Sequence, residues 1–502
     1  METLASELLG GFTLIFTPEY LLFCILGILL GMLFGSIPGL SAIMAISLLV
    51  PFTYTMDPIT SVVFLISIFI GGLYGGTTTG IMFNIPGDSD SAMTAVDGYE
   101  LTKKGESPKA LGFAIVSTAL GCLIGTIGLV FGTNLLAEFS SFLGPVEIMG
   151  LVLIALASMI YTGNNTYKTV FAIMFGLFLS TVGIAPLSGI DRYTFGFSDI
   201  QNGFDFVPVI IGLFAMSEVF VQVSNFKQSD NVEKKSSKIV LPKLREHIKM
   251  KWTYIRSSII GLLIGSLPGI GATVASVVGY TSEKKVSKKK DHFGKGVYEG
   301  VIAPQTASSA AAVGTFIPLL GIGIPGGAVA AILVGVFQIH GLQPGPLLFT
   351  QNSDLVYTLF ASLFLATFFV LIIGIMEVKA AVTIMKLPQS FIWTFITVFS
   401  IMGSFAASHR IFDVTVMLIF GLIGFLAKKL EISIPAIVLG LILGPILEPN
   451  LLRALIIYEN NPLLFFTRPA GGAFILISVF LIIFPMLKRN KAKENDSNYK
   501  AI

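Results

Sequence analysis

Apolar stretches of about 20 residues recur along almost the whole chain, separated by short polar segments. A helix of that length crosses a hydrocarbon core about 30 Å thick. The pattern therefore predicts an all-α polytopic membrane protein with about 11–12 crossings. The crossings are expected near residues 59–86, 109–136, 142–162, 166–186, 205–222, 299–324, 354–378, 388–408, 411–427, 431–447 and 463–487.

Residues 257–280 are also apolar, but they do not fit as a crossing. Basic segments flank them on both sides, and lysine and arginine gather on the cytoplasmic side of a membrane. The middle of the segment reads GSLPGIGA (265–272), and proline and glycine break helices. The simplest arrangement is a re-entrant hairpin, because non-helical backbone at membrane depth is tolerated where protein or a wet cavity surrounds it.

A near-copy of this hairpin occurs about 230 residues earlier, since GMLFGSIPGLSA (31–42) matches GLLIGSLPGIGA (261–272). Each copy is followed by an IPG sequence that predicts a broken helix, within 76–87 and within 303–326. Isolated glycines and prolines also kink helices or permit close packing, but two copies in corresponding places predict a duplicated fold. No basic residue flanks the first hairpin, so we expect it to enter from outside, which makes the repeats inverted, as in secondary transporters.

These features predict four parts of the chain. They are a first transporter repeat (1–222), a basic cytoplasmic linker (223–256), a second repeat with an extra C-terminal helix (257–487) and a polar cytoplasmic tail (488–502). The placement of lysine and arginine puts the N-terminus outside and the C-terminus in the cytoplasm. Residues before position 20 are open to two interpretations, an interfacial helix or part of a longer first span.

Composition excludes several classes of protein. The 502 residues are 54% hydrophobic and only 12% charged, which is too little charge for a soluble protein of this length. The chain has no GxxxxGK[ST] loop for nucleotide binding and no HExxH sequence. Its cysteines, Cys24 and Cys122, lie in apolar segments without metal-ligand spacing. We therefore predict neither an enzyme nor a nucleic-acid-binding protein, and no cofactor beyond a coupling cation.

The predicted binding chemistry lies at the hairpin tips and helix breaks. The N-terminus of a half-helix suits an anion, whereas unwound carbonyls and hydroxyls suit Na⁺. The predicted substrate-binding residues are Ser36, Pro38, Gly39, Ser41, Thr77, Thr78, Thr79, Asn84, Ser266, Pro268, Gly269, Thr273, Gln305, Thr306, Ser308 and Ser309. The candidate Na⁺ ligands are the backbone carbonyls of Gly39, Gly269, Pro86 and Pro325. For any one hydroxyl, bonding back to the i−4 carbonyl is an equal alternative.

Full charges are scarce at membrane depth. Glu147, Glu218, Glu299 and Glu377 lie near the ends of predicted helices, where we expect their side chains to reach the interface. A chain of acidic residues that could relay protons is not visible in the sequence. The expected coupling cation is therefore Na⁺ rather than H⁺.

The sequence resembles the large membrane subunit of the tripartite tricarboxylate transporters, the TctA family. The resembling stretches are GSIPGLSA, YGGTTTGIMFNIPGDSDSAMTAVDGYELTKKG, GSLPGIGAT and FGKGVYEGVIAPQTASSAAAVGTFIPLLGIGIPGG, which runs on to HGLQPGPLLF. The resemblance implies cation-driven uptake of di- or tricarboxylates across a bacterial or archaeal inner membrane. It also implies two partners, a small membrane subunit and an extracytoplasmic solute-binding protein.

The chain differs from the family pattern APEAANNAAA, since Gln305 stands in place of the acidic residue and Ser308 and Ser309 in place of the asparagines. These changes lie in the predicted lining and leave the organic acid open. Alternating access between the two tips is the expected mechanism. The alternatives are a passive anion channel, which would show flux without ion coupling, and a non-transporting scaffold, which would tolerate helical residues at Pro38 and Pro268. The oligomeric state is also open, a homo-oligomer included.

Overall fold

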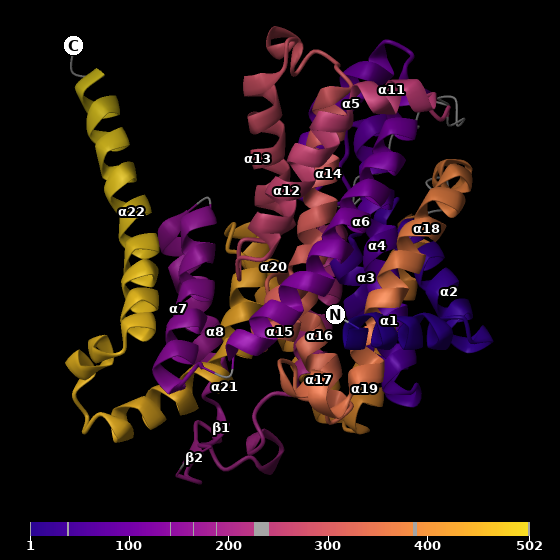
Figure 1. The fold of residues 1–502 in the computed structure, drawn as a ribbon. Helices are drawn as coiled ribbons and strands as arrows, with labels where there is room; N and C mark the ends of the chain where they lie inside the picture. The colour runs from indigo at the N-terminus through magenta and orange to yellow at the C-terminus, as the bar shows by residue number, and fades with distance from the viewer. Residues whose placement is uncertain are drawn as a thin grey trace. The chain divides into compact units, whose positions relative to one another are not determined.

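A computed structural model shows an almost entirely helical chain (Figure 1). It describes residues 2–37, 40–140, 142–163, 165–186, 188–224, 240–384 and 389–499. The sheet in this part of the chain is one antiparallel pair, β1 (Gly183–Ile184) and β2 (Asp191–Arg192). The predicted all-α class is therefore confirmed.

Ten helical segments of the described residues are long and apolar enough to cross a membrane. They are α2 (Pro18–Gly35), α4 (Pro58–Phe83), α6 (Ser107–Ser140), α7 (Pro145–Thr162), α9 to α10 (Phe206–Ser224), α14 to α15 (Glu299–Ile322), α18 (Ser353–Ile384), α19 (Gln389–Ser408), α20 (Ile411–Lys429) and α21 (Ile434–Ile457). The predicted crossing at 166–186 is the shorter helix α8 (Thr166–Ser180) of 15 residues, about 22 Å long. Conversely, α2, predicted as one arm of a hairpin, is itself long enough to span.

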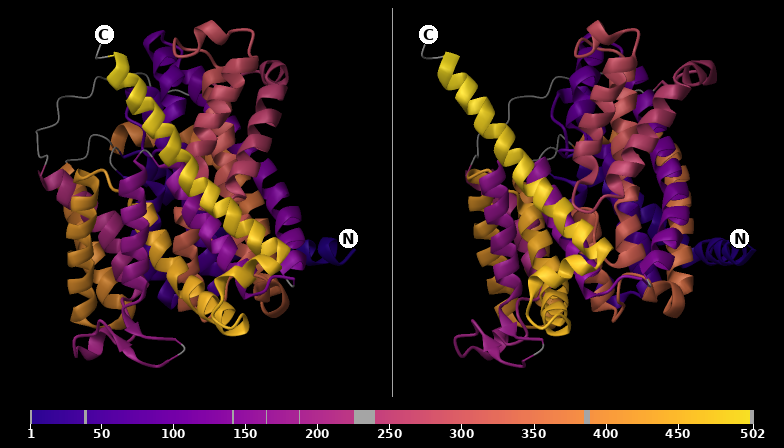
Figure 2. Two further views of the ribbon diagram at one scale, coloured as in Figure 1. Left: turned by 90° about the vertical axis from the view of Figure 1, so that its left-hand side faces the viewer. Right: turned by 60° about the vertical axis from the view of Figure 1, so that its left-hand side comes forward.

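Shorter elements connect these helices. They are α1 (Glu2–Ile15), α3 (Ala42–Leu49), η1 (Val50–Thr55), α5 (Ala92–Lys103), η2 (Ser198–Ile200), α11 (Leu244–Lys249), α12 (Lys251–Gly265), α13 (Gly271–Val286), η4 (Lys290–His292), α16 (Ala328–Ile339), α17 (Leu347–Gln351) and η5 (Pro462–Thr467). Within Phe206–Ser224, η3 (Ile211–Met216) is a π-helical turn between α9 (Phe206–Ile210) and α10 (Ser217–Ser224). The last helix, α22 (Pro469–Tyr499), is long and unbroken (Figure 2).

The chain forms two compact units. Unit 1 contains residues 1–137, 206–267 and 271–425, and unit 2 contains 138–205, 268–270 and 426–502. Each unit takes segments from both predicted repeats, because the units reflect packing and the repeats reflect duplicated sequence. The division at 222, 256 and 487 stays a prediction, and residues 225–239 of the linker lie outside the described residues.

The second hairpin consists of two antiparallel half-length helices in unit 1. Helices α12 and α13, of 15 and 16 residues, are about 22–24 Å long and too short to span a hydrocarbon core. Glu283, near the end of α13, accepts hydrogen bonds from Thr253 at 2.9 Å and from Arg256 near the start of α12. Figure 1 shows the two helices beside α14. This geometry fits the predicted re-entrant hairpin, and entry into the membrane stays a prediction.

The same helix contact occurs in both halves of the chain. Gly31 in α2 lies so close to α4 that a Cβ atom there would overlap the carbonyl oxygen of Ile68. Gly261, the matching residue of α12, lies equally close to the carbonyl oxygen of Ala307 in α14. Small residues let helix backbones approach closely in membranes, so α2 packs directly on α4 and α12 packs directly on α14.

The two helix breaks also share one backbone geometry. Helix α4 ends at Asn84 and α15 ends at Gly323, both in the left-handed region with φ of 58° and 77°. After each end the chain turns back. The amide of Gly87 donates to the Gly76 carbonyl at 3.1 Å, and the amide of Gly326 donates to the Thr315 carbonyl at 3.2 Å. Both IPG sequences thus end a helix and fold back onto it, as the sequence predicts.

Unit 2 is built around α7, α8, α21 and α22. Helix α22 lies along α7 (Figure 1), and α8 packs on α21 through Gly176 and Gly440. Arg192 of β2 forms a bidentate ion pair with Glu448 of α21, with N–O distances of 2.5 and 3.1 Å. The pair joins the strand loop to this helix.

Candidate functional site

The first hairpin tip carries a buried serine that contacts an acidic side chain. Ser36 directly follows α2 and is fully buried. Its hydroxyl has two acceptors, the carbonyl oxygen of Met32 at 2.6 Å and the Oε1 atom of Glu377 in α18. The backbone turns at Ser36 because α2 ends there, so the helix end places this hydroxyl against α18.

A second predicted site residue contacts the same carboxylate. Thr78 in α4 is fully buried, and its hydroxyl lies 3.0 Å from Oε2 of Glu377 and 3.3 Å from the carbonyl oxygen of Tyr74. The first tip, the first broken helix and α18 therefore meet at one carboxylate. The expectation that Glu377 reaches the interface is wrong, because its side chain is only 5% exposed. Glu147 and Glu299 are likewise buried.

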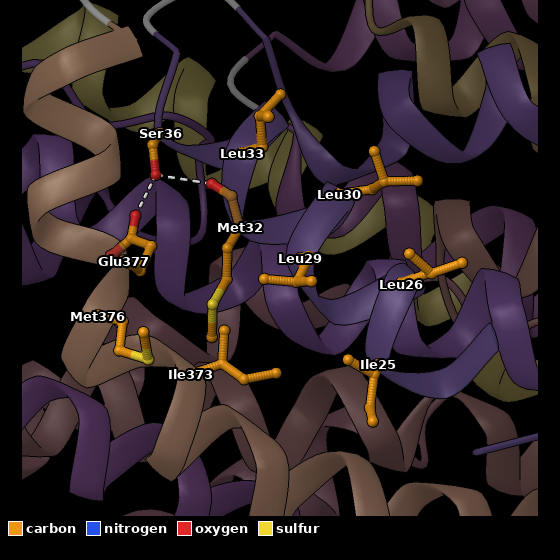
Figure 3. Close-up of a pocket in the computed structure, with 10 residues that line it drawn as sticks. All are labelled: Ile25, Leu26, Leu29, Leu30, Met32, Leu33, Ser36, Ile373, Met376 and Glu377. Carbon is orange, nitrogen blue, oxygen red and sulfur yellow. Dashed lines mark hydrogen bonds between the residues drawn. The ribbon is translucent and has the colours of Figure 1, made fainter. Parts of the chain in front are cut away.

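Glu377 and Ser36 border a pocket of about 480 Å³ between α2 and α18 (Figure 3). Aliphatic and methionine side chains form the rest of its lining. These are Ile25, Leu26, Leu29, Leu30, Met32, Leu33, Ile373 and Met376. In Figure 3 the carboxylate points toward the Ser36 hydroxyl, and the apolar side chains surround the space beside them. The carboxylate thus lies between hydroxyl donors and an apolar cavity.

Gln305 joins four helices through its side-chain amide. Its Oε1 atom accepts from Thr77 at 2.6 Å and Thr94 at 3.2 Å. Its Nε2 atom donates to Thr118 at 2.9 Å and to the Leu73 carbonyl at 3.3 Å. Oxygen and nitrogen each have two partners, which is the full capacity of an amide. In this conformation Gln305 and Thr77 hold α4, α5, α6 and α14 together.

The second broken segment (303–326) also contains buried hydroxyls that have no hydrogen-bond partner among the described residues. Thr306 and Ser309 in α14 are fully buried, and neither hydroxyl has a hydrogen-bond partner among the described residues. Ser308 is also buried and donates to the Gln305 carbonyl at 3.1 Å. An unpaired buried hydroxyl costs free energy, so Thr306 and Ser309 are the predicted residues best placed to gain a partner when a ligand or water enters.

The second hairpin tip is divided between the two units. Ser266, at the end of α12 in unit 1, donates to the Leu263 carbonyl at 2.9 Å. Pro268 and Gly269 belong to unit 2, where the Pro268 carbonyl accepts from Ser158 at 2.5 Å. Gly269 has a φ of 82°, and a Cβ atom there would overlap the Ala155 carbonyl. Its left-handed backbone and this close approach both require glycine.

Thr273 connects the start of α13 to the segment after the first break. Its hydroxyl donates to Asp90 and lies 3.0 Å from the hydroxyl of Ser89. The second hairpin therefore contacts the loop that follows the first IPG sequence. The two segments are 183 residues apart in the chain, and no sequence pattern indicates this contact.

The other predicted site residues have local roles in the structure. Ser41 caps α3 by accepting from the Met44 amide at 3.3 Å, and Thr79 bonds back to the Gly76 carbonyl at 3.1 Å. Asn84 is exposed at the end of α4. Two further residues, Pro38 and Gly39, lie outside the described residues. The carbonyls of Gly269, Pro86 and Pro325 lie at the tip and breaks, and their role as Na⁺ ligands stays a prediction.

Asp97 in α5 is a buried acidic residue that sequence analysis did not identify. Its carboxylate accepts from the amides of Gly294, Gly296 and Val297 at 2.7–3.1 Å and from the Tyr280 hydroxyl at 2.8 Å. Burial, and then the bond to Asp97, raise the pKa of Tyr280 above its ordinary value. The loop after α13 is thereby fixed to α5. The glycines in "HFGKGV" are the signal for such a turn.

Comparison with known proteins agrees with this helical architecture. The family described as "Tripartite tricarboxylate transporter TctA family" matches residues 21–439. A relative from Agrobacterium vitis, described as "Uncharacterized 52.8 kDa protein in TAR-I ttuC' 3'region", is 32% identical over 496 residues, 99% of each chain. A second, described as "Uncharacterized protein in TAR-II ttuC' 3'region", is 32% identical over 235 residues, 47% of this chain and 97% of the relative.

No solved structure matches the chain. The family is a membrane component of a tripartite transporter and not a family of enzymes. It implies a small membrane subunit and a solute-binding protein as partners. The ten apolar helices and this match identify a multi-pass membrane protein. The chain therefore belongs to the tripartite tricarboxylate transporter TctA family.

Proposed function

We propose that the protein takes up di- or tricarboxylates, or related organic anions, by secondary active transport driven by a cation gradient. The observation that carries the proposal is the meeting of Ser36, Thr78 and Glu377, because it joins the first tip and the first broken helix at one buried ionisable group. A non-transporting scaffold does not require a buried carboxylate between a helix break and a cavity. Ionisable residues inside a membrane mark ion and substrate pathways.

The anion would be held by hydroxyls and backbone amides. In the described residues of α2, α4 and α14 the structure places no lysine or arginine, so the site would use the dipoles of helix ends and hydrogen-bond donors. Thr306 and Ser309 supply two buried hydroxyls without partners. Alternating access would then move the hairpin tips relative to the scaffold.

The protein would work in a bacterial or archaeal inner membrane, with the N-terminus outside and the C-terminus in the cytoplasm. Lysines and arginines in the loops around 103–109 and 284–295 support this orientation. Delivery of the anion by an extracytoplasmic solute-binding protein fits the family's tripartite organisation.

Counterflow of radiolabelled organic acids in proteoliposomes tests the proposal. We expect saturable exchange of at least one labelled acid from a panel of citrate and C4 dicarboxylates, and accumulation against a gradient when a cation gradient is imposed. Bulky replacements Ser36→Trp, Thr78→Trp and Ser309→Trp should reduce uptake at least tenfold while the protein still inserts. The matched control is Thr394→Trp, at an exposed threonine of α19, which should retain uptake.

Three results would contradict this function. Unchanged uptake in all three variants would overturn the site assignment. Flux that never saturates and ignores every cation gradient would identify a channel. The absence of exchange with any acid of the panel, in the presence of both partner proteins, would favour a scaffold.

A further inference from the structure

In the part of the chain that the structure describes, the carboxylate of Glu377 has no positively charged partner. Its hydrogen bonds come from two neutral hydroxyls, Ser36 on α2 and Thr78 on α4. Its side chain is 5% exposed. Among the described residues it takes part in no ion pair, whereas the buried carboxylates of Glu283 and Asp413 each pair with an arginine. Glu377 is thus a buried acid stabilised only by neutral donors.

The elements packed against α18 bring one titratable group to this carboxylate. Tyr74 of α4 lies against Gly374, one helical turn before Glu377, and is close enough to interact with its charge. Asp88, in the segment after α4, lies against Gly76 of α4. The other charged residues of the neighbouring elements lie at far ends. Glu19 lies at the start of α2, and Asp57 caps the start of α4. Glu7 of α1 faces Tyr357. Lys109, at the start of α6, pairs with Glu246. On α18 itself Asp354 lies in the first turn, and the side chain of Lys379 lies outside the described residues.

The surroundings of Glu377 favour a proton over a metal cation. A lone ionised carboxylate in a low-dielectric site is costly, and such a group takes up a proton or a paired cation instead. A metal cation needs about six or more oxygen ligands, whereas Glu377 contacts two hydroxyls among the described residues and borders a cavity of aliphatic and methionine side chains. A proton needs only one carboxylate oxygen.

We propose that Glu377 is the residue that binds the co-transported proton, and that its protonation couples proton entry to anion binding. The inference rests on the proposed function and replaces the Na⁺ preference of the sequence with a proton. The proton from the outer solution binds one carboxylate oxygen, and it leaves again to the cytoplasm after the anion has left. No bond other than this O–H bond forms or breaks.

The coupling follows from charge and hydrogen bonding. An ionised Glu377 repels an anion bound near Ser36 and Thr78 and occupies both hydroxyls as an acceptor. A protonated Glu377 is neutral and is itself a donor, so it removes the repulsion and frees a hydroxyl for the anion. By linkage, each ligand raises the affinity for the other by the same factor. Anion affinity should therefore fall as pH rises.

The test uses full-length protein with its small membrane subunit and solute-binding protein in pyranine-loaded proteoliposomes. We expect wild type to acidify the lumen when an acid that passes the counterflow assay is added, without a requirement for Na⁺. Glu377→Gln should lose this acidification at least tenfold. Binding of the same acid to the detergent-solubilised chain should weaken with rising pH in wild type and be insensitive to pH in Glu377→Gln.

Glu299→Gln is the matched control, because Glu299 is also buried but pairs with Lys289 at 3.3 Å. It should keep the acidification. Glu377→Asp, which preserves the carboxyl group, should keep coupling with a shifted pH profile. Acidification that persists in Glu377→Gln, or wild-type uptake that requires Na⁺ and moves no protons, would overturn the proton assignment and leave the transport function standing. Wild-type protein that exchanges no acid would overturn both.

Discussion

The two hairpin tips have nearly the same sequence and different surroundings. Ser36 and Ser266 each follow the glycine that ends a helix, α2 or α12, in GSIPG and GSLPG. Ser36 is fully buried, and its single O–H group lies within reach of two acceptors, the Met32 carbonyl and the Glu377 carboxylate. Ser266 is partly exposed and donates to Leu263 in its own helix. One tip thus meets an ionisable group from a distant helix, and the other is satisfied locally.

This difference separates the features that both halves of the chain share from the contact that only one half makes. The backbone is repeated, since the glycine contacts and the returning hydrogen bonds occur in both halves. The contact with an ionisable group is not repeated among the described residues, because Ser36 contacts Glu377 whereas Ser266 bonds to the Leu263 carbonyl of its own helix. Because Glu377 contacts the first tip, proton binding would occur at that tip only.

The largest loss of stability is expected at the glycine contacts that both halves of the chain share. Gly31→Val and Gly261→Val each force a side chain into a backbone carbonyl of the neighbouring helix, which costs about 3 kcal/mol or more because backbone cannot move aside as a flexible side chain does. Both variants should lose most of their monodisperse protein in size-exclusion chromatography. Gly10→Val, with no atom within 4 Å of the added Cβ, is the control. A loss in only one of the two variants would break the structural equivalence of the halves.

An intermediate loss of stability is expected when the side-chain amide of Gln305, in the second half of the chain, is removed. Gln305→Leu removes four hydrogen bonds and leaves the hydroxyls of Thr77, Thr94 and Thr118 without that partner. We expect a loss of about 2 kcal/mol, measured as a lower midpoint of thermal unfolding in detergent. Gln338→Leu, at an exposed glutamine of α16, should change the midpoint little. Equal midpoints for both variants would show that the Gln305 network does not hold the helices together.

The smallest effect is expected from the two tip serines themselves. Ser36→Ala leaves Glu377 with one donor fewer and should lower stability by about 1 kcal/mol, whereas Ser266→Ala removes a local bond and should cost a few tenths. Thermal unfolding of both variants, measured side by side at one pH, checks this. Equal shifts would mean that the environments of the two tips are energetically the same.

Sequence patterns predicted the parts of the site that local chemistry controls. The two IPG sequences lie at helix ends, as predicted. Thr78 and Ser309 are buried, and their role in binding stays a prediction. Glu377 was assigned to a helix end because a single charge close to a basic segment usually reaches the interface. Its burial depends on packing against α2 and α4, which periodicity does not report.

The sequence by itself determined the helical membrane class and the helix breaks, because hydrophobic length, proline and glycine act over a few residues. The duplicated hairpins stay a prediction. The tertiary structure decided which matching residues of the two halves have different surroundings. Contacts across 341 residues placed Ser36 on Glu377, and contacts across 183 residues placed Thr273 on Asp90. The physical reason is that burial and hydrogen bonding depend on neighbours in space, and the chain order of an α-helical bundle does not specify those neighbours.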